Sequence, residues 1–373
     1  MKYYFVSGEP SGDLHGANLM KALKNADPGA GFRFWGGDKM AAVGGEPVKH
    51  IRDLAFMGFT EVLMNLREIL KNIKLCKEDI VAWKPDVVIL IDYPGFNLRI
   101  AEFLKKAGIK VYYYISPQLW AWKAGRVELV RKYVDRMLVI LPFEKDFYAR
   151  YGIDVDYVGH PLLDEIKNLE PGLPDGNTFR QQNGLNENPI IALLPGSRFQ
   201  ELKRMLPVMS GVASLFPEYQ FVIAGSASLN SDLYTRFQRN TGLKVITGQT
   251  YALLHNARAA LVTSGTATLE TALFRVPEVV CYKGQKISYL IARRLVKVKY
   301  ISLVNLIMDR EVVKELIQDA MHVENVKREL EKILDPRNAT AMQAEFDILR
   351  EKLGGEGASE RTAQKMLEYL NEK

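Results

Sequence analysis

The sequence repeats one pattern in both halves: a short run of β-branched and aromatic residues, a loop of glycine and small polar residues, and then a segment with helical periodicity. The predicted strands of the first half cover residues 3–7, 32–35, 86–91, 110–115 and 136–141, and those of the second half cover 190–194, 220–224, 244–246, 259–263 and 278–281. Repeated strand–helix–strand units favour a parallel sheet with helices on both faces. The sequence therefore predicts an α/β protein with two doubly wound domains.

A polar stretch rich in proline and glycine separates the two halves, which is the composition of a linker. We therefore expect an N-terminal domain over residues 1–165, a linker over 166–188, a second domain over 189–340 and a helical tail over 341–373. The whole charged region from residue 310 onward is expected to be helical. The tail has two interpretations: it crosses back onto the N-terminal domain, or it exchanges with a second subunit of a homodimer.

Composition narrows the class of partner. The formal net charge of +6 favours anionic ligands such as phosphates and acidic lipid. The sequence has no zinc-finger spacing, no aromatic RNA-binding motif and no long basic run, so nucleic acid is the partner with least support. Cys76 and Cys281 lie far apart and fit neither a disulfide framework nor a zinc site, which indicates free thiols in a reducing cytoplasm. No stretch approaches the ~20 apolar residues that a membrane-spanning helix needs.

The loop after the first predicted strand reads GEPSGDLHG and contains Gly8, Glu9, Ser11, Gly12 and Asp13. Glycines allow the backbone to approach a ligand closely, and the start of a helix offers unpaired N–H groups to an anion. This pattern indicates a binding loop. The alternative is a plain helix start that Ser11 or Asp13 caps.

Asp92 follows the predicted strand that ends at Ile91. A general base for a sugar hydroxyl needs a carboxylate or an imidazole within hydrogen-bond reach, and ligands of α/β sheets bind beyond the carboxyl ends of the strands. Asp92 is therefore a candidate base. The alternative is an aspartate that forms a turn or caps the helix after Phe96.

Two of the four tryptophans, Trp120 and Trp122, lie in a loop after the predicted strand 110–115. Amphipathic aromatic rings often line sugar or acyl sites. The alternative is that they pack one domain against the other.

Two loops of the second half have the composition of phosphate-binding loops. The first contains Gly196, Ser197 and Arg198, and its guanidinium suits a diphosphate. The alternative for Arg198 is a surface ion pair with Glu201. The second loop supplies hydroxyls, backbone N–H groups and a carboxylate for ribose hydroxyls from Ser264, Gly265, Thr266, Thr268 and Glu270. Its alternative is an N-capped buried helix.

An apolar stripe with cationic flanks recurs at helical spacing in the first half. It includes Val62, Leu63, Leu66, Ile69 and Leu70, with lysines and arginines beside them. Such a stripe is typical of a helix that lies at a membrane interface. A helix packed on the sheet has the same periodicity and remains the alternative. A second basic segment over residues 293–299 would add attraction to anionic lipid.

Taken together, these motifs resemble the lipid-A-disaccharide synthase family of glycosyltransferases. The matching segments run in order from residue 8 to residue 306: GEPSGDLHGA, IDYPGFN, SPQLWAWKAGRV, LPFEKDFY, VGHPL, LLPGSR, SGTATLE and SLVNL. The resemblance implies the GT-B architecture, in which two Rossmann-like domains face a cleft. It also implies an inverting reaction that joins UDP-2,3-diacylglucosamine to 2,3-diacylglucosamine 1-phosphate and releases a β-1,6-linked lipid A disaccharide 1-phosphate and UDP.

The resemblance also implies roles for particular residues. UDP is expected against Gly196, Ser197, Arg198 and the run from Ser264 to Glu270. The acceptor is expected near Glu9, Ser11 and Asp13, and Asn305 of the SLVNL segment is expected to belong to the cleft. The resemblance also implies a second acid in many relatives where this chain has Gly95, and if that acid is their base, Asp92 or else Glu9 must take the role here.

The resemblance further implies a peripheral enzyme at the inner face of the cytoplasmic membrane. We expect neither a cofactor nor a metal, and we interpret the D-x-D spacing of Asp154 and Asp156 as coincidental. The rival functions are a GT-B transferase with another lipid acceptor and a UDP-sugar epimerase of the same architecture.

Overall fold

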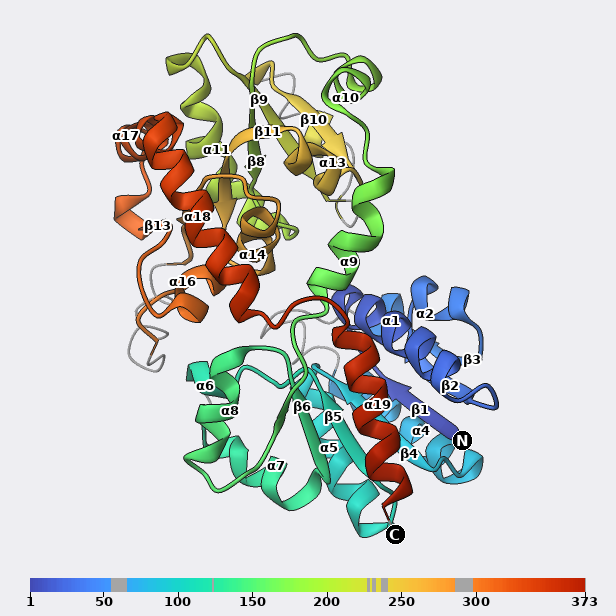
Figure 1. Ribbon diagram of the computed structural model, residues 1–373. Helices are drawn as coiled ribbons and strands as arrows, with labels where there is room; N and C mark the ends of the chain where they lie inside the picture. Colours follow the sequence, from blue (N-terminus) through green and yellow to red (C-terminus); the bar gives the residue numbers. More distant parts are fainter. Residues whose placement is uncertain are drawn as a thin grey trace. The chain divides into compact units, whose positions relative to one another are not determined.

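The computed structural model describes residues 1–54, 66–122, 124–226, 229, 233–235, 241–285 and 298–372. The chain packs into two compact units (Figure 1). Unit 1 comprises residues 1–164 and 353–373, and unit 2 comprises residues 165–352. Each unit is a parallel sheet with helices on both faces, which confirms the predicted α/β class.

The sheet of unit 1 has seven strands, and every described pairing between them is parallel. Its strands in spatial order are β3 (Glu46–His50), β2 (Gly31–Gly36), β1 (Lys2–Val6), β4 (Val87–Ile91), β5 (Val111–Tyr114), β6 (Arg136–Val139) and β7 (Asp156–Tyr157). The chain leaves β1 toward β2 and β3 and then returns to β4 on the other side of β1. The strand order therefore reverses between β1 and β4.

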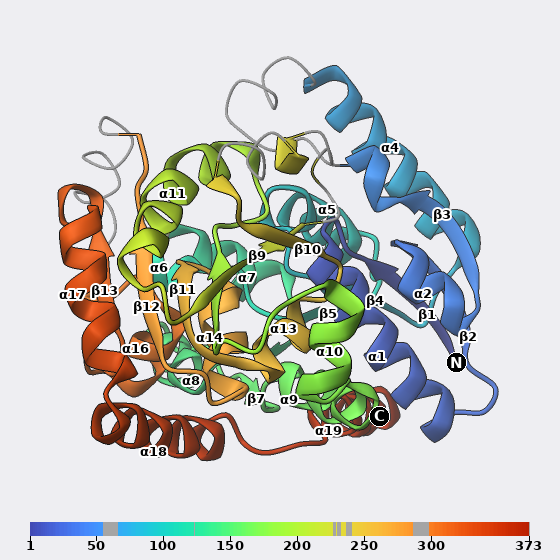
Figure 2. The same cartoon turned by 90° about the horizontal axis from the view of Figure 1, so that it is seen from above.

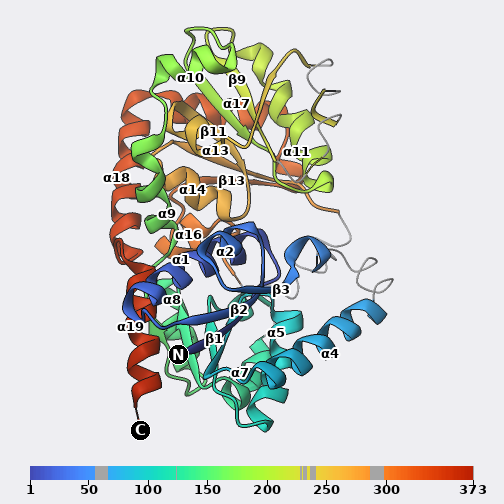
Figure 3. The same ribbon diagram turned by 90° about the vertical axis from the view of Figure 1, so that its right-hand side faces the viewer.

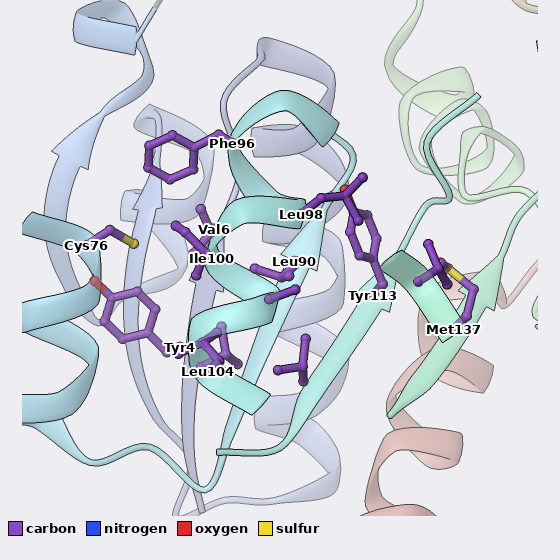
Figure 4. Close-up of a cluster of buried hydrophobic side chains, with 14 of the residues drawn as sticks. Tyr4, Val6, Cys76, Leu90, Phe96, Leu98, Ile100, Leu104, Tyr113 and Met137 are labelled. Carbon is purple, nitrogen blue, oxygen red and sulfur yellow. The ribbon is translucent and has the colours of Figure 1, made fainter. Parts of the chain in front are cut away.

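Successive side chains of these strands point to opposite faces of the sheet, and each face packs against a layer of helices. Tyr4 and Val6 join the core under α4 (Leu66–Trp83), α5 (Pro94–Lys106) and α7 (Val127–Tyr133), part of which Figure 4 shows. Figure 3 shows these three helices on one face of the sheet, and α1 (Pro10–Ala26) and α19 (Ala358–Asn371) on the other. The described residues of the unit also form the shorter helices α2 (Asp38–Val43), α6 (Leu119–Trp122) and α8 (Pro142–Ala149), and the start of α9 (Leu162–Leu169).

The sheet of unit 2 has six parallel strands. Their spatial order is β10 (Lys244–Thr247), β9 (Gln220–Gly225), β8 (Ile190–Leu194), β11 (Ala257–Thr263), β12 (Glu278–Tyr282) and β13 (Lys314–Ile317). Here the chain runs from β8 to β9 and β10 and then returns to β11 beside β8. The order therefore reverses between β8 and β11.

Two cores hold the helices of unit 2 against its sheet. Ile191 and Leu193 face α11 (Phe199–Gly211) and α17 (Val323–Leu334), whereas Ile190 and Ala192 face α10 (Gly176–Asn183) and α13 (Thr250–His255). Figure 2 shows these two pairs of helices on opposite sides of the sheet. The unit also contains α14 (Thr266–Leu273), α16 (Leu303–Met308) and α18 (Pro336–Lys352).

Several parts of the chain differ from the sequence-based expectation. The region from residue 310 onward, expected to be all helical, contains the edge strand β13, because the backbone of this four-residue segment pairs with β12 and its Leu316 is buried in the core. The expected linker contains the second half of α9 and all of α10, and fully buried Phe179 anchors α10 in the core. The C-terminal helices divide: α18 belongs to unit 2, whereas α19 packs on α1 in unit 1 (Figure 1).

Candidate active site

The loops that follow β1 and β4 meet at one edge of the unit 1 sheet. The two strands are parallel neighbours, with Val6 opposite Leu90, so the segment from Ser7 to Glu9 and the turn at Asp92 begin side by side. The point where strand order reverses is where open α/β sheets bind ligands. The structure therefore brings the two candidate carboxylates of this unit, Glu9 and Asp92, to its expected binding edge.

The turn that carries Asp92 has an unusual backbone. Asp92 and Tyr93 are consecutive residues with φ angles of 43° and 48°, in the left-handed region that side chains rarely adopt. Each such residue costs on the order of 1–3 kcal/mol, and strain of this kind gathers at functional sites. Asp92 does not cap the following helix, since the N-cap of α5 is Tyr93 and has no side-chain cap bond.

The carboxyl group of Asp92 is poised to exchange a proton near neutral pH. Burial raises its pKa to about 7, and the negative charge of Glu9 adds to the effect, while the backbone N–H of Tyr93 opposes it. A carboxyl group whose pKa lies near the working pH is well suited to act as a general base. Glu9 influences Asp92 electrostatically, so the two carboxyl groups form one charged cluster.

Gly8 allows the two loops at this edge to lie in close contact. A Cβ atom at Gly8 would lie 2.5 Å from the ring of Tyr93, so only glycine lets that ring rest on the first loop. The Tyr93 ring also stacks on Phe96 at 5.3 Å between centroids. Gly12 is buried at the start of α1, while Ser11 beside it is exposed. The helix begins at Pro10 with Glu9 as N-cap, so neither Ser11 nor Asp13 caps it.

Asp13 has a different task from the one its motif suggests. Its Oδ1 accepts hydrogen bonds from the backbone N–H groups of Gly37 (2.7 Å) and Met40 (3.0 Å), and its Oδ2 accepts one from Lys39 (3.0 Å). The carboxylate therefore neutralises the amino end of α2 and is 4% exposed. Asp13 therefore fixes α2 against α1, and both of its carboxylate oxygens accept hydrogen bonds from the backbone.

The tryptophan loop is anchored by a residue that the sequence interpretation did not single out. Trp120 donates through Nε1 to Glu144 (3.3 Å) and packs edge-on against Phe143 at 5.0 Å. Glu144 also accepts from the backbone N–H of Leu141 (3.0 Å), and burial raises its pKa to about 7. The sequence did contain a signal for Glu144, because it is an acidic residue of the LPFEKDFY segment directly after a predicted strand. The side chain of Trp122 lies outside the described part.

In unit 2 the two phosphate-type loops follow adjacent strands, because β8 pairs with β11. Gly196 has a φ of 108°, and a Cβ atom there would lie 2.3 Å from Glu201 Oε2, so glycine is required at this turn. Glu201 lies 3.6 Å from the guanidinium of Arg198, whose side chain is 61% exposed. An exposed pair of this kind contributes little stability, so Arg198 can turn toward an incoming anion at small cost. Ser197 lies between Gly196 and Arg198 in the same loop.

The second loop of unit 2 presents one exposed part and one buried part. Gly265 and Thr266 are exposed at the start of α14, whereas the Thr268 hydroxyl donates to the Gly265 carbonyl (2.9 Å) inside the helix. Glu270 accepts a hydrogen bond from Tyr251 (3.3 Å), and burial raises its pKa. The amides of the first turn and the Thr266 hydroxyl are therefore the groups best suited to meet a phosphate.

Asn305 is engaged inside unit 2. Its Oδ1 accepts from the N–H groups of Val312 (2.7 Å) and Val313 (3.0 Å), and its Nδ2 donates to Val313 O (2.8 Å) and Glu315 Oε1 (3.0 Å). The residue is fully buried and joins α16 to β13.

Ser264 is tied to the same region, since its hydroxyl donates to the Ile301 carbonyl (2.8 Å). The structure therefore shows Asn305 as a link between α16 and the segment that leads into β13. Glu315, which the sequence interpretation missed, is part of this link.

Comparison with known proteins decides the family. A family model for lipid-A-disaccharide synthetase matches residues 3–368. The chain belongs to the lipid-A-disaccharide synthase family. It is 44% identical to the enzyme of that name from Syntrophus aciditrophicus over 96% of this chain and 95% of the relative, and 38% identical to the one from Geobacter metallireducens over 99% and 97%. Membership makes it a hexosyltransferase of lipid A biosynthesis and confirms the resemblance drawn from the motifs.

Solved structures show the same fold at low sequence identity. A UDP-GlcNAc 2-epimerase from Neisseria meningitidis, bound to UDP-GlcNAc, superposes with a TM-score of 0.70 at 14% identity and covers 99% of this chain and 100% of its own. The calicheamicin glycosyltransferase CalG4 superposes with a TM-score of 0.57 at 17% identity over 100% and 98%. This chain therefore shares the GT-B type of fold with both of these proteins.

Proposed function

We propose that the chain transfers a 2,3-diacylglucosamine unit from UDP-2,3-diacylglucosamine to 2,3-diacylglucosamine 1-phosphate. One observation carries this proposal beyond the family: both units gather their candidate residues where strand order reverses. Unit 1 offers carboxylates at this edge, which suit an acceptor hydroxyl. Unit 2 offers helix amides and an exposed guanidinium, which suit a diphosphate.

The proposed step is a direct displacement at the anomeric carbon. The 6-hydroxyl oxygen of the acceptor forms the new bond to this carbon, its proton passes to Asp92, and the bond to the UDP oxygen breaks with its electron pair. Asp92 must be ionised to accept the proton. Arg198 and the first-turn amides of α11 and α14 stabilise the charge that develops on the leaving diphosphate. The step needs no cofactor and no metal.

The direct test is UDP release from UDP-2,3-diacylglucosamine with and without the acceptor 1-phosphate. We expect UDP release only when the donor UDP-2,3-diacylglucosamine and the acceptor 1-phosphate are both present, with a disaccharide 1-phosphate as the second product. A transferase with another lipid acceptor would release UDP only after the acceptor is exchanged. An epimerase would convert UDP-GlcNAc without any acceptor, and this result would overturn the proposal.

Gly95 bears on which residue is the base. A Cβ atom at Gly95 would have no atom within 4 Å, and the residue lies exposed in the first turn of α5 without a left-handed φ. Neither space nor backbone conformation therefore requires glycine here. We propose that Asp92 acts as the base in place of the acid that many relatives carry at this position.

Gly95→Ala is expected to keep turnover within about twofold and to raise the free energy of unfolding by about 0.5–1 kcal/mol, because alanine loses less backbone entropy than glycine on helix formation. Urea denaturation and the UDP-release assay measure the two quantities. A large loss of activity in a folded Gly95→Ala variant would show that the empty space at residue 95 is needed by the acceptor.

We also propose that the enzyme works at the inner face of the cytoplasmic membrane, with α4 as the contact. In the described part of the chain no helix combines the length and apolar character needed to cross a bilayer. On α4, Ile73 packs into the core, whereas Leu66 and Leu70 are 44% and 52% exposed. Leu70 lies in an apolar groove that Lys74, Lys77 and Phe103 also line. Exposed leucines with cations beside them suit an anionic lipid surface.

Only part of the predicted apolar stripe is exposed on α4. Ile69 is partly buried against the core, so this part of α4 is a packed helix, while Leu66 and Leu70 form its exposed edge. Val62 and Leu63 lie outside the described residues. Assembly into a homodimer also stays a prediction.

The double variant Leu66→Glu/Leu70→Glu is expected to bind anionic phospholipid vesicles at least tenfold more weakly, because each buried leucine contributes about 1.5–3 kcal/mol. Vesicle sedimentation measures the binding, and circular dichroism verifies the fold. Leu215→Glu, at another exposed leucine (46%), is the matched control and should bind normally. Equal binding by the double variant and the control would contradict α4 as the contact.

A further inference from the structure

The strained turn at Asp92 is held by two buried side chains that the proposed mechanism does not use. Two consecutive left-handed residues persist only where their surroundings over-determine the backbone. At this turn the carbonyl oxygen of Asp92 accepts hydrogen bonds from the Asn97 side-chain amide (2.7 Å) and from the Tyr113 hydroxyl. Asn97 and Tyr113 are both fully buried.

Asn97 reaches the turn from within α5. Besides the Asp92 carbonyl, its Nδ2 lies within hydrogen-bond distance of the carbonyls of Ile91 (3.2 Å) and Val6 (3.4 Å). These carbonyls are at the ends of β4 and β1, so one side-chain amide connects both strands of the binding edge with the turn. An ionised aspartate of the same size has no hydrogen to donate, and a protonated one could donate to only one of them.

Tyr113 reaches the same carbonyl from β5, the next strand of the sheet. Its ring is part of the core of unit 1 (Figure 4). The N–H of Asp92 points to the same strand, at 3.4 Å from Tyr114 O and 3.3 Å from Ile115 O, and Ile115 is itself left-handed with a φ of 63°. The turn is therefore braced from α5, from β5 and, through the Tyr93 ring on Gly8, from the first loop.

We infer that Asn97 and Tyr113 are positioning residues, which hold the Asp92–Tyr93 turn left-handed and so keep the Asp92 carboxylate beside Glu9 at the binding edge. This inference rests on the proposed function only in taking Asp92 as the base. If either bond is lost, the turn can relax toward an ordinary backbone conformation, and the carboxylate then moves away from its buried place. The reaction is sensitive to such movement, since a displacement of about 1 Å can cost on the order of 10²-fold in rate.

The surroundings of Asp92 provide a readout that does not depend on catalysis. The groups that act on its carboxyl are the Glu9 carboxylate from the first loop and the Tyr93 backbone N–H, on top of burial. From β5, Tyr113 faces it as a neutral hydroxyl, because burial raises the pKa of Tyr113 well above its usual range, with Arg126 opposing this shift. A carboxylate that relaxes into water should titrate at lower pH, closer to an ordinary aspartate.

The experiment compares Tyr113→Phe and Asn97→Asp with Tyr3→Phe in the full chain. Tyr3→Phe is the matched control, because it removes one hydroxyl bond, to Asp27 at 3.1 Å, from an equally buried tyrosine of β1. The pKa of Asp92 is measured by NMR titration of carbon-13-labelled aspartate, with Asp92→Asn used to assign the signal. The pH profile of kcat/KM is measured on the same samples.

For Tyr113→Phe we expect the Asp92 pKa to fall, the midpoint of the pH profile to fall with it, and kcat to drop at least about tenfold with KM changed less than twofold. Tyr3→Phe should leave the Asp92 pKa and kcat as in the parent. Should Asn97→Asp fail to fold, Tyr113→Phe alone still tests the inference, since it removes a single oxygen atom.

Two results would separate the inference from the proposed function. An unchanged Asp92 pKa and kcat in Tyr113→Phe, with Asp92→Asn inactive, would overturn the positioning role and leave Asp92 as the base. A lowered Asp92 pKa in Tyr113→Phe, with full activity in both Tyr113→Phe and Asp92→Asn, would uphold the brace on the turn and overturn Asp92 as the base.

Discussion

Asp92→Asn is expected to lower kcat by about 10²–10⁴-fold, the usual contribution of a general base, while the protein stays folded. Asparagine has the size of aspartate but cannot take up the acceptor proton. It also tolerates the left-handed backbone at this position, where φ is 43°. Steady-state UDP release measures the loss, and Glu9→Gln measures how far the neighbouring carboxylate shares the role.

The pH dependence of the parent enzyme follows from the raised pKa of Asp92. With a pKa of about 7, the carboxyl group is ionised and active above this pH and protonated below it. The kcat/KM of the parent should therefore fall as the pH is lowered through about 7. A profile that stays flat down to pH 5 would contradict Asp92 as the base.

Stability should change in the opposite direction to activity. Because the folded state holds the Asp92 proton more tightly than the unfolded chain, stability from this group is complete below the ordinary aspartate pKa and declines as the pH rises toward about 7. At pH 8 the parent therefore carries a half-buried charge that Asp92→Asn lacks. We expect the Tm of the variant at pH 8 to equal or exceed that of the parent. An inactive variant with a much lower Tm would indicate a structural role.

Arg198→Ala is expected to lower kcat by about 10²–10³-fold and to weaken UDP binding, because one preorganised donor to the leaving diphosphate is lost. The fold should be unaffected, within about 0.5 kcal/mol, since the side chain is 61% exposed and its pair with Glu201 is weak. Calorimetry with UDP and the UDP-release assay measure the two effects.

The controls for Arg198 separate charge from geometry. Arg198→Lys keeps the charge but loses the planar pair of donors, so we expect intermediate activity. Lys203→Ala removes an exposed cation further along α11 and should behave as the parent. Turnover and UDP affinity that stay normal in Arg198→Ala would show that the ion pair with Glu201 is the whole role of this arginine.

The buried strands were the easiest part of the structure to predict, and the edge strands the hardest. β4 and β8 are buried at every residue and read as continuous apolar runs, VVILI and IIALL. β13 reads KELI and β3 reads EPVKH, which have no such signature. These short edge segments become strands because a neighbouring strand offers free backbone groups.

The candidate site shows the same division at the level of side chains. Asp92 and Arg198 could be found from their place after a strand, because that place is local in sequence. Asp13 and Asn305 look equally functional in their motifs. The side chain of Asp13, however, bonds backbone groups at least 24 residues away along the chain, and that of Asn305 bonds backbone groups at least 7 residues away. Glu144 and Glu315 gain their importance only from what they anchor.

The sequence by itself determined the two parallel sheets, the loops that follow their strands and the family, because periodicity, turn residues and motifs are properties of neighbouring residues. The tertiary structure decided which loops meet and which polar side chains remain available. Adjacency of β1 with β4, and of β8 with β11, depends on strand pairing over long distances in the chain. Once the strands pair, most buried donors and acceptors must find a partner, and that requirement engages Asp13 and Asn305 while the Asp92 carboxylate stays at the edge of its sheet.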